Sequence, residues 1–123
     1  MSDENAREEA MLLTSVLALF YRNGAADRAR DAVGSWSEPP GMEQLDNQHP
    51  RGTETRDGIE SLLEVAETIG AYVKHGALSR ELVADVVWVE GTWRKFERYV
   101  KELRASIGEE SLYENFEALA VKG

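Results

Sequence analysis

The fold class is decided by residues 79–108, which read SRELVADVVWVEGTWRKFERYVKELRASIG. From Leu82 to Ile107, apolar residues recur here at alternating spacings of four and three. Such a heptad pattern is typical of a helix that buries one seam along its length. Because the phase continues without a slip, we predict one long helix over about residues 80–107, roughly 40 Å in length. Gly91 is the expected position of a bend.

The rest of the chain shows the same helical periodicity. A first helix is predicted from about Asp3 to Arg22, with Val16, Leu19 and Phe20 on its apolar face. A short helix over about 25–33 follows. Two further helices are predicted between about Asp57 and His75 and after Ser111. All periodic segments are helical, so we expect an all-α fold, a bundle of four to five helices.

The helix boundaries are predicted from capping signals. Asn23-Gly24 is expected to end the first helix, Gly34 the second, Gly76 the third and Gly108 the long helix, since these residues tolerate left-handed backbone angles. The third and last helices begin with sequences that resemble a capping box, and Leu78 is expected to staple the start of the long helix. The expected N-caps are Ser2 or Asp3, Asp57, Ser79 and Ser111.

Residues 35–56 differ from the rest of the chain, because all three prolines lie there among mainly polar residues. No regular helix passes through Pro39-Pro40. We therefore predict a long polar surface loop over about 35–56, anchored by Trp36. The alternative is a segment that binds a partner or covers a site, since loops of this length are uncommon unless functional or disordered.

Length and composition exclude several classes of protein. A chain of 123 residues fits a single helical domain over 1–123. It contains no cysteine, which excludes disulfide scaffolds and thiol nucleophiles. A net charge of −9 argues against direct binding of nucleic acid. The start of the sequence is acidic and the apolar run from Met11 to Tyr21 is too short to span a membrane. We expect a soluble, cytoplasmic protein, with a peripheral amphipathic anchor as the alternative interpretation of that run.

Catalytic and metal-binding patterns are scarce in the sequence. Neither His49 nor His75 has the spacing of a known metal motif. Glu60, Glu64 and Glu67 share one face of a predicted helix, opposite its apolar side, and are interpreted as a solvated face. We therefore assign no catalytic residue, no cofactor and no metal ligand, although an enzyme is not excluded.

The candidates for partner binding are basic and aromatic residues. Lys95 and the other cations between residues 94 and 104 form a basic stripe, interpreted either as a solvated face or as a docking surface for an acidic partner. Trp88 falls off the heptad seam, and we expect it to be buried in a second layer or, alternatively, to contact a partner. The assigned partner-binding candidates are Trp88, Arg94, Arg98, Lys101, Arg104 and Trp36.

Residues 59–120 resemble small, helical, uncharacterised bacterial proteins of a domain-of-unknown-function family. The matching features are packing and turn motifs: the helix from Ile59 to Val73, the junction from Lys74 to Ser79, Trp93, the segment from Tyr99 to Arg104 and the segment from Tyr113 to Ala120. Some members of that type carry an N-terminal membrane tether, whereas this chain has only the short run from Met11 to Tyr21. The resemblance implies a helical fold and supplies no catalytic residues.

Together these patterns favour a helical protein–protein interaction module that self-associates into a homo-oligomer. The long seam offers more apolar edge than a small bundle covers. The first alternative is an acidic inhibitor that mimics nucleic acid and blocks an enzyme that binds it. The second alternative is a small-molecule-binding bundle or enzyme, which would require a pocket inside the bundle.

Overall fold

The computed structural model describes residues 3–21 and 24–121. Across these ranges the chain forms helices and no strand, so the predicted all-α class is confirmed. The described chain has seven helices, rather than the four to five predicted. They are α1 (Asp3–Tyr21), α2 (Ala25–Ser35), α3 (Met42–Gln48), α4 (Glu54–Lys74), α5 (Arg80–Val86), α6 (Val89–Ile107) and α7 (Glu114–Val121).

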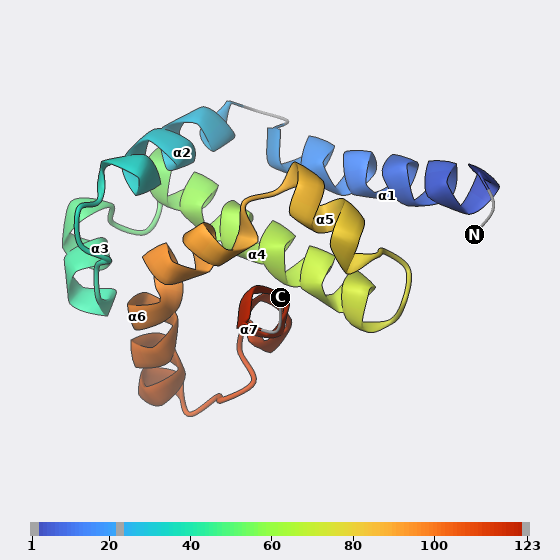
Figure 1. Cartoon of the computed structure of the whole chain (residues 1–123). Coiled ribbons are helices and arrows are strands. Elements are labelled where there is room, and N and C mark those ends of the chain that lie inside the picture. The colour runs from blue at the N-terminus through green and yellow to red at the C-terminus, as the bar shows by residue number, and fades with distance from the viewer. Residues whose placement is uncertain (1–2, 22–23, 122–123) are drawn as a thin grey trace.

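Helix α4 runs through the middle of the molecule, and the other helices pack around it (Figure 1). Its main neighbours are α1, α2 and α7, while α6 contacts α3 and α7. Ile59 and Leu63 of α4 belong to one buried cluster, which also contains Phe96 of α6. Ile69, further along α4, belongs to a second cluster with Val83 of α5. Helix α4 therefore contributes to both parts of the core.

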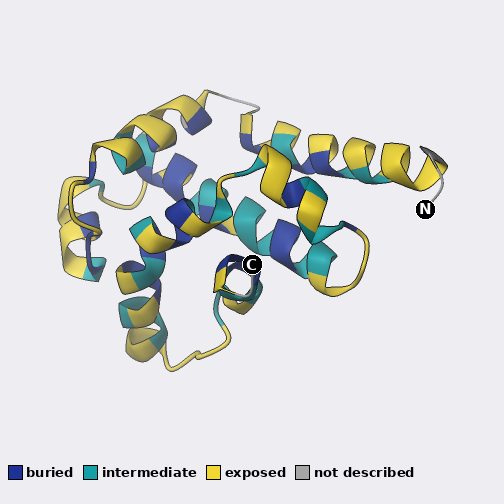
Figure 2. Ribbon diagram, viewed as in Figure 1, coloured by how far each residue is buried: buried dark blue, intermediate teal, exposed yellow. Residues whose placement is uncertain are grey.

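Helix α1 follows the prediction closely. Val16 and Phe20 are buried, but Leu19, predicted on the same face, is 56% exposed. Exposed residues gather toward the N-terminal end of α1 (Figure 2). No helix of the described ranges is long and apolar enough to cross a membrane. The predicted cap Ser2, the predicted end Arg22 and the stop residue Asn23 lie outside the described residues.

The prediction of one long loop over 35–56 is wrong, because this segment contains α3 and both flanking helices extend into it. Helix α2 continues through Gly34 to Ser35. Helix α4 begins at Glu54 with Thr53 as its N-cap, not at Asp57, and the Thr53 hydroxyl accepts a hydrogen bond from the Arg56 amide. The predicted anchor Trp36 is buried against Phe96, with ring centroids 5.5 Å apart. A short helix with one buried residue, Leu45, gives no periodic signal.

The prediction of one long helix over 80–107 is also wrong, since the chain breaks between α5 and α6. Val87 has extended backbone angles (φ −123°, ψ 133°), and Trp88 is the N-cap of α6. The break lies in a run of β-branched and aromatic residues that favour extended backbone. Gly91, the expected bend, lies inside α6. The heptad phase continues across the break, so spacing alone does not reveal it.

Capping predictions succeed where the cap is local. Ser79 accepts a hydrogen bond from the Leu82 amide at 3.2 Å, as a Ser N-cap should. Gly108 ends α6 with left-handed angles, as predicted. Ser111 is not an N-cap, because its hydroxyl donates to Glu109 and α7 begins only after Tyr113, which has a positive φ of 58°.

Candidate functional site

An open apolar cleft of about 480 Å³ lies where α1, α2, α4 and the α5–α6 junction meet. Its floor is formed by the buried side chains Phe20, Ile69, Phe116 and Leu119. These residues come from α1, α4 and α7, so the floor depends on the packing of all three helices. Its volume lies in the range of roughly 300–1,000 Å³ that is usual for small-molecule sites.

The rim of the cleft carries large apolar side chains that face solvent. Tyr21 is 49% exposed, Val86 54% and Trp88 70%. The expected burial of Trp88 is therefore wrong. Its indole packs over Gly91, where an added Cβ would collide with the ring. Contiguous exposed apolar patches commonly mark a ligand-binding groove or an interaction surface.

The charge of the cleft has the opposite sign to that of the chain. No Asp or Glu is among the described residues that line it, although the whole chain carries an excess of nine acidic charges. Its two cations are Arg30 and Lys95. The Arg30 guanidinium lies 5.9 Å from the centroid of the Tyr21 ring. Lys95 Nζ donates to the Trp36 carbonyl at 2.5 Å.

The basic stripe on α6 is mostly engaged within the molecule. Arg98 pairs with Glu102 at 3.0 Å, and Lys101 pairs with Glu97 at 2.8 Å. Hydrogen bonding to Glu97 raises the pKa of Lys101.

The Arg104 side chain is only 13% exposed, and it ties α6 to the segment around α7. Its guanidinium donates to the Leu112 carbonyl and pairs with Glu117, each at 2.8 Å. Arg94 is exposed. Trp36, the remaining candidate, is buried in the core. The structure therefore places Trp88 on the cleft rim and does not bring the other five candidates to that site.

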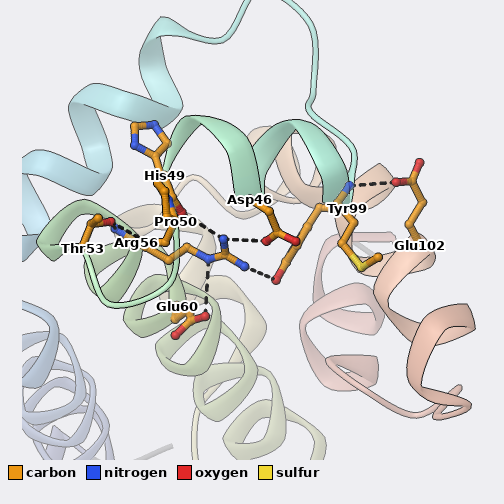
Figure 3. A network of polar contacts seen from close by, with 9 residues as sticks. Asp46, His49, Pro50, Thr53, Arg56, Glu60, Tyr99 and Glu102 are labelled. Carbon is orange, nitrogen blue, oxygen red and sulfur yellow. Dashed lines mark hydrogen bonds and ion pairs between the residues drawn. The ribbon is translucent and has the colours of Figure 1, made fainter.

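Arg56 forms a polar node that the sequence analysis did not identify (Figure 3). It is fully buried and donates to Asp46 Oδ1 at 2.8 Å, the His49 carbonyl at 3.0 Å and the Tyr99 hydroxyl at 3.1 Å. Burial opposes its charge, but the bonds to Asp46 and Tyr99 outweigh burial and raise its pKa. Glu60 of the same helix also pairs with it at 3.4 Å. Because Asp46 lies on α3 and Tyr99 on α6, the node holds α3, α4 and α6 together.

The prediction that Glu67 belongs to a solvated face is wrong, because Glu67 caps α7 from another helix. Its carboxylate accepts hydrogen bonds from the Asn115 and Phe116 amides at 2.9 Å and from the Asn115 side chain at 2.8 Å. These amides belong to the first turn of α7, which has no intrahelical acceptors for them. Because Phe116 lines the cleft floor, Glu67 helps to position that floor.

The described residues contain no group of three or more His, Cys, Asp or Glu side chains that could hold a metal ion. His75 is exposed at the end of α4. His49 is half-buried beyond α3, and its carbonyl serves Arg56. Among the described residues that line it, the cleft offers apolar surface, two cations and the hydroxyl groups of Tyr21 and Thr92.

Comparison with known proteins identifies the family. No curated protein and no solved structure gives a significant match to the chain. The family model of a domain of unknown function, DUF4760, matches residues 4–122. This agrees with the resemblance seen over residues 59–120 and extends it across nearly the whole sequence. The chain belongs to the DUF4760 family.

Proposed function

We propose that the protein is a helical binding module that holds the apolar part of a ligand in the cleft. The observation that carries this proposal is the cleft itself, an open apolar hollow of about 480 Å³ whose rim exposes Trp88, Val86 and Tyr21. Burial of apolar surface stabilises a complex by roughly 25 cal/mol per Å² removed from water, less the cost of association.

A neutral dye, Nile red, tests this proposal without invoking charge. We expect saturable binding of one dye molecule per chain, with an increase in dye fluorescence. Ala66→Phe places a ring in the cleft, since Ala66 lines it, and should weaken binding about tenfold or more. Ala105→Phe is the matched control, because Ala105 is exposed near the end of α6 and does not line the cleft.

The helical content of both variants is checked by circular dichroism. Trp88→Ala, which removes a rim side chain instead of filling the cleft, provides a second variant in case Ala66→Phe fails to fold. Non-saturable dye binding, or equal binding by the wild type and by the folded cleft variants, would refute the proposal.

Self-association through the same face is a second candidate function, favoured by the 70% exposure of Trp88. It corresponds to the protein-interaction module predicted from the sequence. Light scattering after size exclusion should show a dimer or larger species that Trp88→Ser converts to a monomer. A monomeric wild type at high micromolar concentration would eliminate this candidate.

The acidic-inhibitor alternative has less support. Several carboxylates bind groups within the molecule: Glu9 accepts from the Ser79 amide, Glu67 from α7 and Glu102 from the Met42 amide. Carboxylates committed to such bonds are poor mimics of a phosphate row. A cytoplasmic location and a single domain stay predictions of the sequence.

A further inference from the structure

Two cations, Arg30 and Lys95, lie beside the apolar surface of the cleft. In the described chain, several cations on the helices have a carboxylate partner: Arg28 pairs with Glu54, Arg98 with Glu102 and Arg104 with Glu117. Within the same described residues, neither Arg30 nor Lys95 forms an ion pair. Two cations left without a counterion, beside apolar surface and in an acidic protein, indicate an anionic ligand group.

Both cations lie along the wall that α2 forms. Arg30 is on α2, one turn before the cleft-lining Gly34. Lys95 reaches from α6 to the carbonyl of Trp36, the residue that caps the end of α2. An ammonium has three donors, so the bond to Trp36 leaves others for a ligand, and a guanidinium has five. The wall therefore offers N–H donors above an apolar floor.

We propose, on the basis of the proposed function, that the cleft binds a free, single-chain amphiphile with an anionic head. Its alkyl chain lies on the floor formed by Ile69, Phe116 and Leu119, and its head lies against Arg30 and Lys95. A volume of about 480 Å³ suits one chain, and the exposed indole of Trp88 covers the chain from the rim.

Three probes with the same tail and different heads test the inference: dodecanoate, dodecanol and dodecyltrimethylammonium. Each is used below its micelle concentration to displace Nile red. Exposed ion pairs each change an affinity by roughly 1.4- to 5-fold. We therefore expect dodecanoate to bind about tenfold more tightly than dodecanol, and the cationic probe to bind most weakly.

Substitutions assign the head group to its site. Arg30→Gln and Lys95→Gln should each weaken dodecanoate binding about threefold, and the double variant about tenfold, with dodecanol unaffected. Arg94→Gln removes an exposed cation from the same helix as Lys95 and should change nothing, because Arg94 does not line the cleft. The ratio of the dodecanoate affinity to the dodecanol affinity reports the head-group contact, and circular dichroism checks that the double variant is folded.

Several outcomes would overturn the inference while the proposed function stands. In each of them Nile red binds saturably. The contradicting results are equal affinities for dodecanol and dodecanoate, a double variant that still prefers dodecanoate, or a dye that no probe displaces. A further contradicting result is sedimentation of the protein with phosphatidylglycerol vesicles in a way that requires Arg30 and Lys95, without binding of free dodecanoate. That result would assign the site to a membrane surface and would equally reject the proposal. Absence of saturable Nile red binding rejects the proposed function itself.

Discussion

Removal of the Glu67 carboxylate should loosen α7 and with it the floor of the cleft. Glu67→Ala deletes the acceptor of three hydrogen bonds, two from the amides of Asn115 and Phe116 and one from the Asn115 side chain. Loss of an N-terminal cap costs about 0.5–2 kcal/mol. Loss of the favourable interaction with the helix dipole costs about 0.3–1 kcal/mol more.

Together with the side-chain bond to Asn115, these contributions give a loss of about 2–3 kcal/mol in the free energy of unfolding. For a domain of this size the loss corresponds to a fall in Tm of about 10 °C. Glu67→Gln keeps one acceptor oxygen but loses the charge, so we expect a smaller loss of about 1 kcal/mol.

Thermal unfolding followed by circular dichroism measures these losses, and amide hydrogen exchange locates them. The Asn115 and Phe116 amides should exchange faster in Glu67→Ala. Glu64→Ala is the matched control, because Glu64 is an exposed carboxylate one turn earlier on the same helix, and it should change stability by less than about 0.5 kcal/mol. Equal Tm values for Glu67→Ala and Glu64→Ala would refute the capping role.

Three further predictions concern packing, buried charge and pH. Gly70→Ala should lower the free energy of unfolding in urea by about 1–3 kcal/mol, since a Cβ there would meet the backbone of α7. A Cβ at Gly34 has open space, so Gly34→Ala should stabilise the protein by up to about 1 kcal/mol. Equal effects of the two variants would contradict the close approach of α4 and α7. Arg56→Met should cost about 2–3 kcal/mol, because it leaves the buried Tyr99 hydroxyl and the His49 carbonyl without their donor. Arg28→Met removes an exposed ion pair and should cost under about 1 kcal/mol. Similar losses in the two variants would show that the node is not structural. Burial, with nearby Tyr99 and glutamates, raises the pKa of Tyr113 from 10.0 to about 12. The folded state thus holds a proton that the unfolded state has lost, and stability is complete below about pH 10 and falls as the pH rises toward 12. Tyr113→Phe should flatten the plot of Tm against pH in this range. An unchanged slope would contradict the role of Tyr113.

The sequence predicts those parts of the fold that depend on neighbouring residues. Helix content follows from spacing, and the cap at Ser79 and the end at Gly108 follow from residue type and position. Two of the errors, at the starts of α3 and α7, arise where the controlling partner is distant in the chain. Glu67 lies 48 residues before the Asn115 amide that it caps, and Glu102 lies 60 residues after the Met42 amide that it binds. No local pattern predicts such bonds.

Both remote caps act on helices that the sequence predicts wrongly: it predicts no helix at α3, and it predicts that α7 begins at the wrong residue. Helix α3 begins at Met42, whose amide is bound by Glu102 of α6, and this bond lowers the pKa of Glu102 (Figure 3). Helix α7 follows Tyr113, whose positive φ does not suit a conventional N-cap, and Glu67 supplies the acceptor instead. Glu67 and Glu102 are therefore structural carboxylates, since they satisfy helix ends that have no local cap.

The errors of prediction also coincide with the cleft. An unbroken helix through Val87 would have continued the heptad seam; the break instead turns Val86 to Val89 into a wall and leaves the Trp88 indole on the rim above Gly91. Helix α7 begins at Glu114, later than predicted, and it contributes Phe116 and Leu119 to the floor of the cleft. Departures from local rules are expected where a fold serves a function. Two of the departures, the α5–α6 break and the start of α7, meet at one hollow, and that hollow also holds Arg30 and Lys95, which form no ion pair within the described residues. Their convergence favours the cleft over the basic stripe of α6, whose charges are mostly paired, as the surface on which this protein acts.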